Sequence, residues 1–192
     1  MNSMFDDKIK SIKTERLILR EIVVDDVDEI YAIFSDEDIA KYDWFEAITD
    51  KKTALHFIQH YKEEYDKKEE ITLGIALKDS NKLIGICCLG DFELSARRAE
   101  IGYDIVKNEW NKGYATEAIK ALTMYGFSEL NLNRVEALIT PGNEASVKVL
   151  KKVGYIQEGI VRERDLIKGK LEDGIIMAIL KRDMEKLLKI RR

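Results

Sequence analysis

The chain is poor in cysteine and gives no sign of a cysteine-based scaffold or catalyst. Its two cysteines, Cys87 and Cys88, are adjacent in a strand-like run. Neighbouring residues of a strand point to opposite faces, so an ordinary bridge between them is not expected. A thiol nucleophile needs a nearby histidine, but His56 and His60 belong to a separate helical segment. We therefore interpret both cysteines as reduced packing residues.

The chain also lacks a positive excess and a long apolar run. The formal net charge is −4 and the isoelectric point is about 5.4, which disfavours nucleic acid as a partner. No uninterrupted apolar span approaches about 20 residues, and no apolar signal-peptide segment follows Met1. These absences predict no membrane partner and a cytoplasmic location.

A metal site is not expected. His56 and His60 are four residues apart on a predicted helix, but no glutamate stands between them in the register of a zinc motif. A zinc site also needs further ligands, and no third ligand is apparent in the sequence.

The residues that are present predict one α/β domain covering 1–192. The chain is 45% hydrophobic and 35% charged, without an internal repeat or a low-complexity linker. Expected strands are 17–19, 72–77, 83–89, 99–106, 134–140, 155–164 and 175–180. One expected helix begins near residue 25, and the others cover about 49–65, 115–129, 143–152 and 183–189. The polar turn 78–82 predicts an antiparallel hairpin, and the order as a whole predicts a mixed α+β sheet with helices on both faces.

The segment 110–118, Trp-Asn-Lys-Gly-Tyr-Ala-Thr-Glu-Ala, joins a predicted strand to a predicted helix. Gly113 and Ala115 allow a bound group to come close to the backbone. The first turn of the helix offers unpaired N–H groups and the positive end of the helix dipole to an anion. The segment therefore predicts a site for a phosphorylated cofactor.

Three motifs together resemble the GNAT superfamily of acyl-CoA-dependent N-acetyltransferases. They are segment 110–118, Asn143-Glu144-Ala145-Ser146, and Lys151-Lys152-Val153-Gly154-Tyr155. The RimJ/RimL branch commonly reads W-G-K-G-Y-A-T-E-A at the first motif, and N-x-x-S followed by K-x-G-F/Y at the others. The resemblance runs from Thr14 to about Leu180. It implies acetyl-CoA as cosubstrate and a mostly antiparallel mixed sheet whose fourth and fifth strands, 99–106 and 134–140 here, splay apart.

The resemblance also implies how the cofactor is held. Backbone groups of Ile105 and Val106 would bind the pantetheine arm like an added strand, and Asn143 would both cap its helix and touch the cofactor. Backbone N–H groups would bind the pyrophosphate at Asn111, Lys112, Gly113, Tyr114, Ala115 and Thr116. The chain departs from the broader pattern by placing Trp110 where Gln or Arg is usual, Asn111 where Gly is frequent and Lys107 where Pro is frequent.

Acetyl transfer needs a base for the amine and stabilisation of the departing thiolate. Glu100 is the candidate base, and its alternative role is a surface carboxylate beside Arg97 and Arg98. Many relatives use a tyrosine seven residues after the motif asparagine, but Leu150 occupies that position here. Ser146 is the candidate hydrogen-bond donor to the sulfur. Its alternative role is to complete the first turn of its helix.

The acceptor is predicted to be a primary amine. An α-amino group, with a pKa of about 8, is deprotonated far more often at neutral pH than a lysine-like amine. That difference favours a protein N-terminus of the ribosomal-protein type, and a polyamine or amino-sugar antibiotic is the alternative. Acidic residues crowding 25–43 either attract a cationic acceptor or form a solvated face. A non-catalytic acyl-CoA-binding module is an alternative to the enzyme. A homodimer formed through the late strands is also expected.

Overall fold

The computed structural model describes residues 11–190. The strands are β1 (Ile12–Lys13), β2 (Leu17–Arg20), β3 (Ile71–Leu77), β4 (Leu83–Glu93), β5 (Arg98–Ile105), β6 (Arg134–Ile139), β7 (Ile156–Ile167) and β8 (Lys170–Leu180). The α-helices are α1 (Val27–Phe34), α2 (Glu37–Ala40), α3 (Lys51–Lys67), α4 (Tyr114–Ser128), α5 (Glu144–Val153) and α6 (Lys181–Ile190). Short 3₁₀ turns η1 (Val24–Asp26) and η2 (Lys107–Glu109) complete the set.

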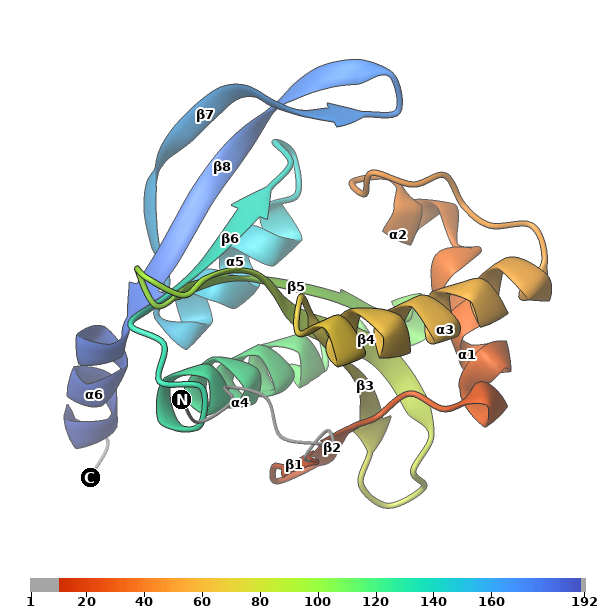
Figure 1. The fold of residues 1–192 in the computed structure, drawn as a ribbon, viewed down its shortest axis with the longest axis horizontal. Coiled ribbons are helices and arrows are strands. Elements are labelled where there is room, and N and C mark those ends of the chain that lie inside the picture. The colour runs from red at the N-terminus through yellow and green to blue at the C-terminus, as the bar shows by residue number, and fades with distance from the viewer. Residues whose placement is uncertain (1–10, 191–192) are drawn as a thin grey trace.

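The strands form one mixed sheet in the order β1-β2-β3-β4-β5-β6-β8-β7 (Figure 1). Every neighbouring pair is antiparallel except β5 with β6. The predicted hairpin is confirmed, because Leu73 lies opposite Cys87 in the β3–β4 pair. The two-residue strand β1 and the four-residue helix α2 were not expected from the sequence, since both are too short to give a clear periodicity.

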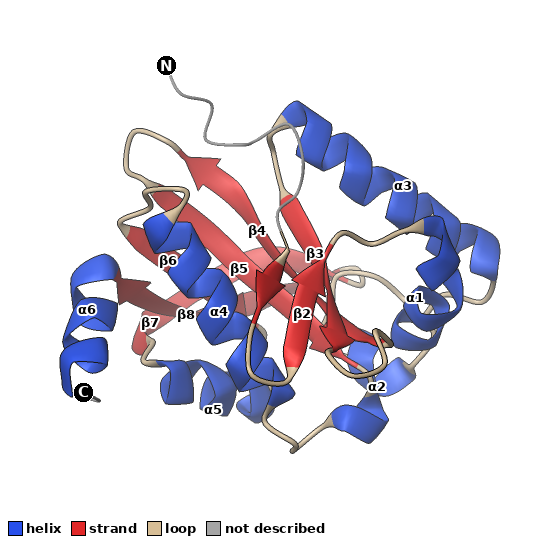
Figure 2. Cartoon of the chain, turned by 90° about the horizontal axis from the view of Figure 1, so that it is seen from below, coloured by secondary structure: helices blue, strands red, loops and turns tan. Residues whose placement is uncertain are grey.

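Helices cover both faces of the sheet, as predicted, and each face has its own core (Figure 2). On one face α4 and α5 contribute Ile119, Leu122 and Leu150 to a large cluster. On the other, α1 and α3 contribute a second cluster that includes Ile33 and Ile58. In β4, Ile84, Cys87 and Leu89 pack in the larger cluster and Leu83 and Ile86 in the second. Ile84 and Ile86 are two residues apart but face opposite ways, because the pairing with β3 is irregular at this point. Cys87 packs in the larger cluster, and both cysteines are free, as predicted.

The pairing between β5 and β6 ends early. Arg98, Ala99 and Glu100 pair with residues 134–136, but β5 continues to Ile105 and β6 to Ile139 with no further pairing between them. Figure 1 shows β6 and β8 rising away from β5. The predicted splay is therefore present, between the fifth and sixth strands once β1 is counted. It opens the sheet at the point where Glu100 lies.

Candidate active site

Glu100 lies on β5 at the last residue that pairs with β6, opposite Glu136. It lines a strongly polar cavity of about 590 Å³. The cavity is lined by Glu64, Lys68, Glu69, Glu70, Asp91, Phe92, Glu93, Arg98, Glu100 and Arg164. Burial, reinforced by the charge of Asp91, raises the pKa of Glu100 to about 7, although Arg164 acts in the opposite direction. A carboxyl with this pKa is ionised in part at neutral pH and is suited to accept a proton there.

The loop between β5 and α4 contains two of the departures from the family pattern, Asn111 and Lys107. Asn111 and Gly113 have φ angles of 60° and 84°, in the left-handed region. Asparagine tolerates that region better than other residues with a side chain, so it can replace the frequent glycine. Lys107 opens η2, and its amine pairs with Asp38 of α2.

The start of α4 presents free backbone donors. The first hydrogen bond of this helix runs from the N–H of Glu117 to the carbonyl of Gly113, at 3.1 Å. The N–H groups of Tyr114, Ala115 and Thr116 therefore precede the first intrahelical bond and have no acceptor within the helix. The predicted pyrophosphate-binding residues thus form one turn at a helix N-terminus, half-buried at its helical residues, with the exposed Asn111, Lys112 and Gly113 leading into it.

A network around Glu117 fixes this turn to the N-terminal strands, and sequence reasoning missed it. The carboxylate accepts hydrogen bonds from the Thr14 hydroxyl at 2.6 Å, and from the Arg16 backbone N–H and Nε at 2.8 and 2.7 Å. The Arg16 guanidinium also donates to the carbonyl of Lys112 at 3.0 Å and lies 4.5 Å from the ring centroid of Tyr114. Burial by itself raises the pKa of Glu117, but these donors outweigh it and hold the pKa below its ordinary value.

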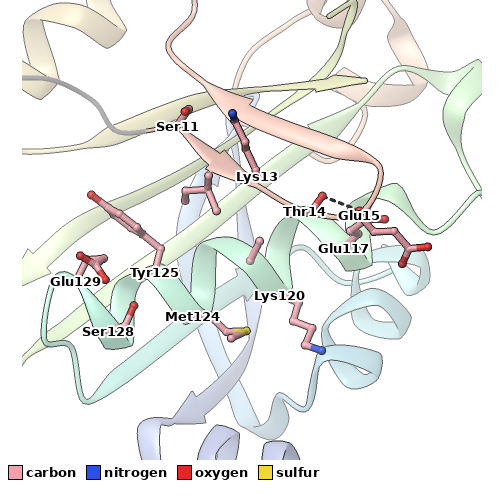
Figure 3. Close-up of a pocket in the computed structure, with 12 residues that line it drawn as sticks. Ser11, Lys13, Thr14, Glu15, Glu117, Lys120, Met124, Tyr125, Ser128 and Glu129 are labelled. Carbon is pink, nitrogen blue, oxygen red and sulfur yellow. Dashed lines mark hydrogen bonds between the residues drawn. The ribbon is translucent and has the colours of Figure 1, made fainter. Parts of the chain in front are cut away.

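Figure 3 shows the Thr14–Glu117 hydrogen bond at the edge of a second cavity, of about 640 Å³, between β1 and α4. None of residues 111–116 lines it, and neither Glu100 nor Ser146 does. This cavity extends along α4 from Glu117 to Glu129, away from the point where β5 and β6 part. It is therefore not the cavity in which the predicted base lies.

Backbone groups of β5 face the opening beyond Glu100. The N–H of Val106 donates to the carbonyl of Ile84 in β4 at 2.9 Å. Because the sides of an antiparallel strand alternate, the backbone groups of Tyr103 and Ile105 then point away from β4. The carbonyl of Ile105 accepts from Trp110 Nε1 at 2.6 Å, which ties the loop back to the strand. Of the two residues expected to bind pantetheine, Ile105 presents its N–H to the opening, whereas the Val106 N–H already has a partner.

On α5, Asn143 caps the helix as predicted: its side-chain oxygen accepts from the backbone N–H of Ser146 at 3.1 Å. Gly154 ends the helix at a φ of 119°, and a Cβ there would lie 2.5 Å from Leu187. Leu150, which replaces the usual tyrosine, is fully buried in the core. The cap uses the backbone N–H of Ser146 and not its hydroxyl, which lies near Tyr103 of β5. Burial raises the pKa of that phenol to about 12, and the Ser146 hydroxyl opposes part of the rise.

A segment around α2 spans the open end of the sheet. Thr140, just after β6, donates to the carbonyl of Tyr42 at 2.9 Å, and the Tyr42 hydroxyl donates to Gly142 at 3.1 Å. Lys168, in the turn between β7 and β8, donates to the carbonyl of Ala40 at 2.7 Å. Residues 40–42 are thereby attached both to the end of β6 and to the β7–β8 hairpin.

Two carboxyls, Asp43 directly after this segment and Asp104 on β5, lie close enough to influence each other. Burial raises the pKa of Asp43 to about 6, against the opposing charge of Lys168. Burial likewise raises the pKa of Asp104 on β5, and the charge of Asp43 adds to the effect. Other acidic residues of 25–43 have structural partners instead: Asp26 binds Arg20, Asp36 caps α2 and Asp28 pairs with Lys51. Sequence reasoning named Asp43 only within a run and assigned no functional role to Asp104.

Within residues 11–190, no group of three or more histidine, cysteine or acidic side chains is arranged to hold a metal ion. In the same residues, no helix has both the length and the apolar character needed to cross a membrane.

Comparison with known proteins agrees with the motifs. The family "Acetyltransferase (GNAT) domain" matches residues 16–156. The N-acetyltransferase p20 of Bacillus licheniformis, itself uncharacterised, is 35% identical over 175 residues, covering 91% of this chain and 98% of the relative.

Two solved structures have the same fold. A GNAT-family acetyltransferase from Bacillus anthracis is 28% identical with a TM-score of 0.80, covering 90% of this chain and 99% of its own. A Vibrio cholerae protein, provisionally described as a ribosomal-protein-serine acetyltransferase, is 27% identical with a TM-score of 0.80, covering 89% and 97%. The chain therefore belongs to the GNAT family of acetyltransferases, which depend on acetyl-CoA as acyl donor.

Proposed function

We propose that the protein transfers an acetyl group from acetyl-CoA directly to a primary amine, with Glu100 as the general base. The observation that carries this proposal is the position of Glu100 where β5 and β6 part, together with a pKa of about 7. A base with that pKa can take the proton of an attacking amine at neutral pH. These features support a donor site and a proton acceptor within one splayed sheet.

The residues present fit acetyl-CoA. The N–H groups at the start of α4 suit a pyrophosphate, and the lack of a Cβ at Gly113 leaves room for the backbone to approach it. The N–H of Ile105 and the backbone of Tyr103 offer an unpaired strand edge to the pantetheine amides. Acetyl-CoA itself supplies an activated thioester, so the protein has only to bind it, orient it and manage the protons.

For the acceptor, we propose the N-terminal amine of a protein, as in the RimJ/RimL branch. The support is the low intrinsic pKa of such amines and the likeness to the Vibrio cholerae protein described above. The Asp43–Asp104 pair favours a cationic acceptor, because a nearby positive charge offsets the burial that keeps the two carboxyls from ionising. Spermidine N(1)-acetyltransferase of Escherichia coli is 26% identical over 161 residues, so a polyamine is the second candidate.

Thermal unfolding with acetyl-CoA tests the donor half of the proposal. At about 100 times Kd the ligand should add ~2.7 kcal/mol of stability and raise Tm by several degrees. Product formation with peptides bearing free N-termini, the same peptides acetylated beforehand, and spermidine tests the acceptor half. If acetyl-CoA gives a clear thermal shift but none of the amines is acetylated, the protein is a non-catalytic binding module.

Asp104→Asn in the same assay separates acceptor recognition from donor binding. We expect the KM for a cationic acceptor to rise about tenfold, which corresponds to ~1.4 kcal/mol, with little change in the thermal shift by acetyl-CoA. An unchanged KM would show that the carboxyl pair does not contact the acceptor.

We also propose a homodimer through β7. This strand forms the sheet edge and exposes Ile156, Ile160 and Leu166, at 60%, 59% and 65% of their surface. An exposed apolar edge strand tends to pair with another chain. Sedimentation equilibrium of the 22.2 kDa chain should give twice that mass, and Ile160→Lys should return it to the monomer.

A further inference from the structure

The phenolic oxygen of Tyr103 is buried without a hydrogen-bond partner among the described residues. Polar atoms on two other aromatic side chains, one buried and one part-buried, are paired. Tyr155 Oη lies 2.8 Å from the Thr123 hydroxyl, and Trp110 Nε1 donates to a carbonyl. A buried hydroxyl without a partner is unfavourable, so its retention calls for an explanation.

The position of Tyr103 suggests one. It lies three residues beyond Glu100, in the part of β5 that no longer pairs with β6. Its side chain is on the opposite face of the strand from Glu100, on the face that α4 and α5 cover. There the Ser146 hydroxyl is its neighbour. Two hydroxyls from different elements thus lie near each other on this face, at the part of β5 that no longer pairs with β6, and neither is used by the capping hydrogen bond of α5.

The buried Leu150 adds to this reading. The leucine side chain at this position of α5 cannot donate a hydrogen bond, so a donor to the departing sulfur has to come from another residue. Tyr103 approaches from the strand instead of the helix. We propose that Tyr103 is a further catalytic residue, which together with Ser146 hydrogen-bonds the departing sulfur of acetyl-CoA; this rests on the direct transfer proposed above.

The chemistry favours hydrogen bonding over full proton transfer. Burial raises the pKa of Tyr103 to about 12, and a thiol has a pKa near 8.5, so the phenol keeps its proton beside a thiolate. In the step, the C–N bond forms and the C–S bond breaks with its electron pair going to sulfur. The surplus proton of the amine goes to Glu100. The Tyr103 O–H then stabilises the negative sulfur without being consumed.

Tyr103→Phe tests this inference, and Tyr155→Phe is the matched control. Both remove one buried phenolic hydroxyl, but that of Tyr155 pairs with Thr123 deep in the core. We expect Tyr103→Phe to lower kcat about ten- to hundredfold, with the Kd for acetyl-CoA within about twofold, because a thioester sulfur is a weak acceptor. Tyr155→Phe should lower Tm and leave kcat unchanged, whereas Tyr103→Phe should not lower Tm.

A second readout does not depend on turnover. The ultraviolet absorbance of the thiolate reports the pKa of the coenzyme A thiol on the protein. Wild type should hold that pKa about one unit below that of free coenzyme A, a tenfold preference for the thiolate, and Tyr103→Phe should abolish most of the difference. Wild-type kcat and an unchanged thiol pKa in Tyr103→Phe would overturn the inference. A wild-type chain that binds coenzyme A but acetylates no amine would refute the proposed function, and the thiol titration would still decide whether Tyr103 contacts the sulfur.

Discussion

Replacing Glu100 with glutamine is expected to lower kcat by about 10²- to 10⁴-fold, the usual contribution of a general base. In the wild type, kcat/KM should rise with pH through an inflection near 7, because Glu100 must lose its proton before it can accept one from the amine. The variant should lack this inflection and keep only the one that belongs to the amine. Steady-state rates from about pH 5.5 to 9 with one acceptor measure both effects.

The same substitution should not unfold the protein. Burial raises the folded-state pKa of Glu100 above its ordinary value of 4.5, so ionising it above pH 7 disfavours the folded state. Glu100→Gln should therefore keep or increase Tm at pH 8. Glu69→Gln is the control, since it removes an exposed carboxylate from the lining of the same cavity and should leave kcat unchanged. If Glu100→Gln retains wild-type kcat and the inflection near 7, Glu100 is not the base.

Glu117→Ala is expected to produce the second large effect, a loss of about 2–3 kcal/mol of stability and a fall in Tm of about 5–10 °C. The carboxylate accepts three hydrogen bonds from Thr14 and Arg16, and its removal leaves those donors without their acceptor. Arg16 then no longer holds the carbonyl of Lys112 in place. We therefore also expect the Kd for acetyl-CoA to rise about tenfold, measured by calorimetry.

The pH dependence of this effect has a definite sign. The folded-state pKa of Glu117 is depressed, so its stabilisation is present above its unfolded pKa and is lost as the pH falls through the folded value. The stability gap between wild type and Glu117→Ala should accordingly shrink in acid. Glu144→Ala is the matched control: it removes an exposed carboxylate from the first turn of α5 and tests the helix dipole alone. Equal losses in the two variants would count against a specific network at Glu117.

Much of the fold was predictable because its signals are local. The alternating pattern of 134–140 and the helical spacing of apolar residues after Tyr114 involve residues only a few positions apart, and both the strand and the helix form. The Asn143 cap and the Gly154 ending also depend on near neighbours, and both have the expected geometry. The elements β1 and α2 were missed because two and four residues are too few to establish a period.

The candidate site was predictable only where one segment carries it. The turn 111–116 is contiguous in sequence, so its backbone donors followed from composition and position alone. Arg16 and Glu117, in contrast, are 101 residues apart and meet because β2 and the start of α4 lie side by side. The proximity of Tyr103 on β5 to Ser146 on α5 likewise depends on the tertiary fold, since the two residues are far apart in the chain.

The sequence by itself determined the order of the longer elements, the candidate anion-binding turn and the caps, since each follows from residues within a few positions of one another. The tertiary structure alone decided where β5 and β6 part, which hydroxyls and carboxyls meet there, and the pKa of Glu100. These properties come from burial and from charges on other elements, such as Asp91 and Arg164. Sheet register and helix packing bring such groups together, and no short pattern in the chain encodes either of them.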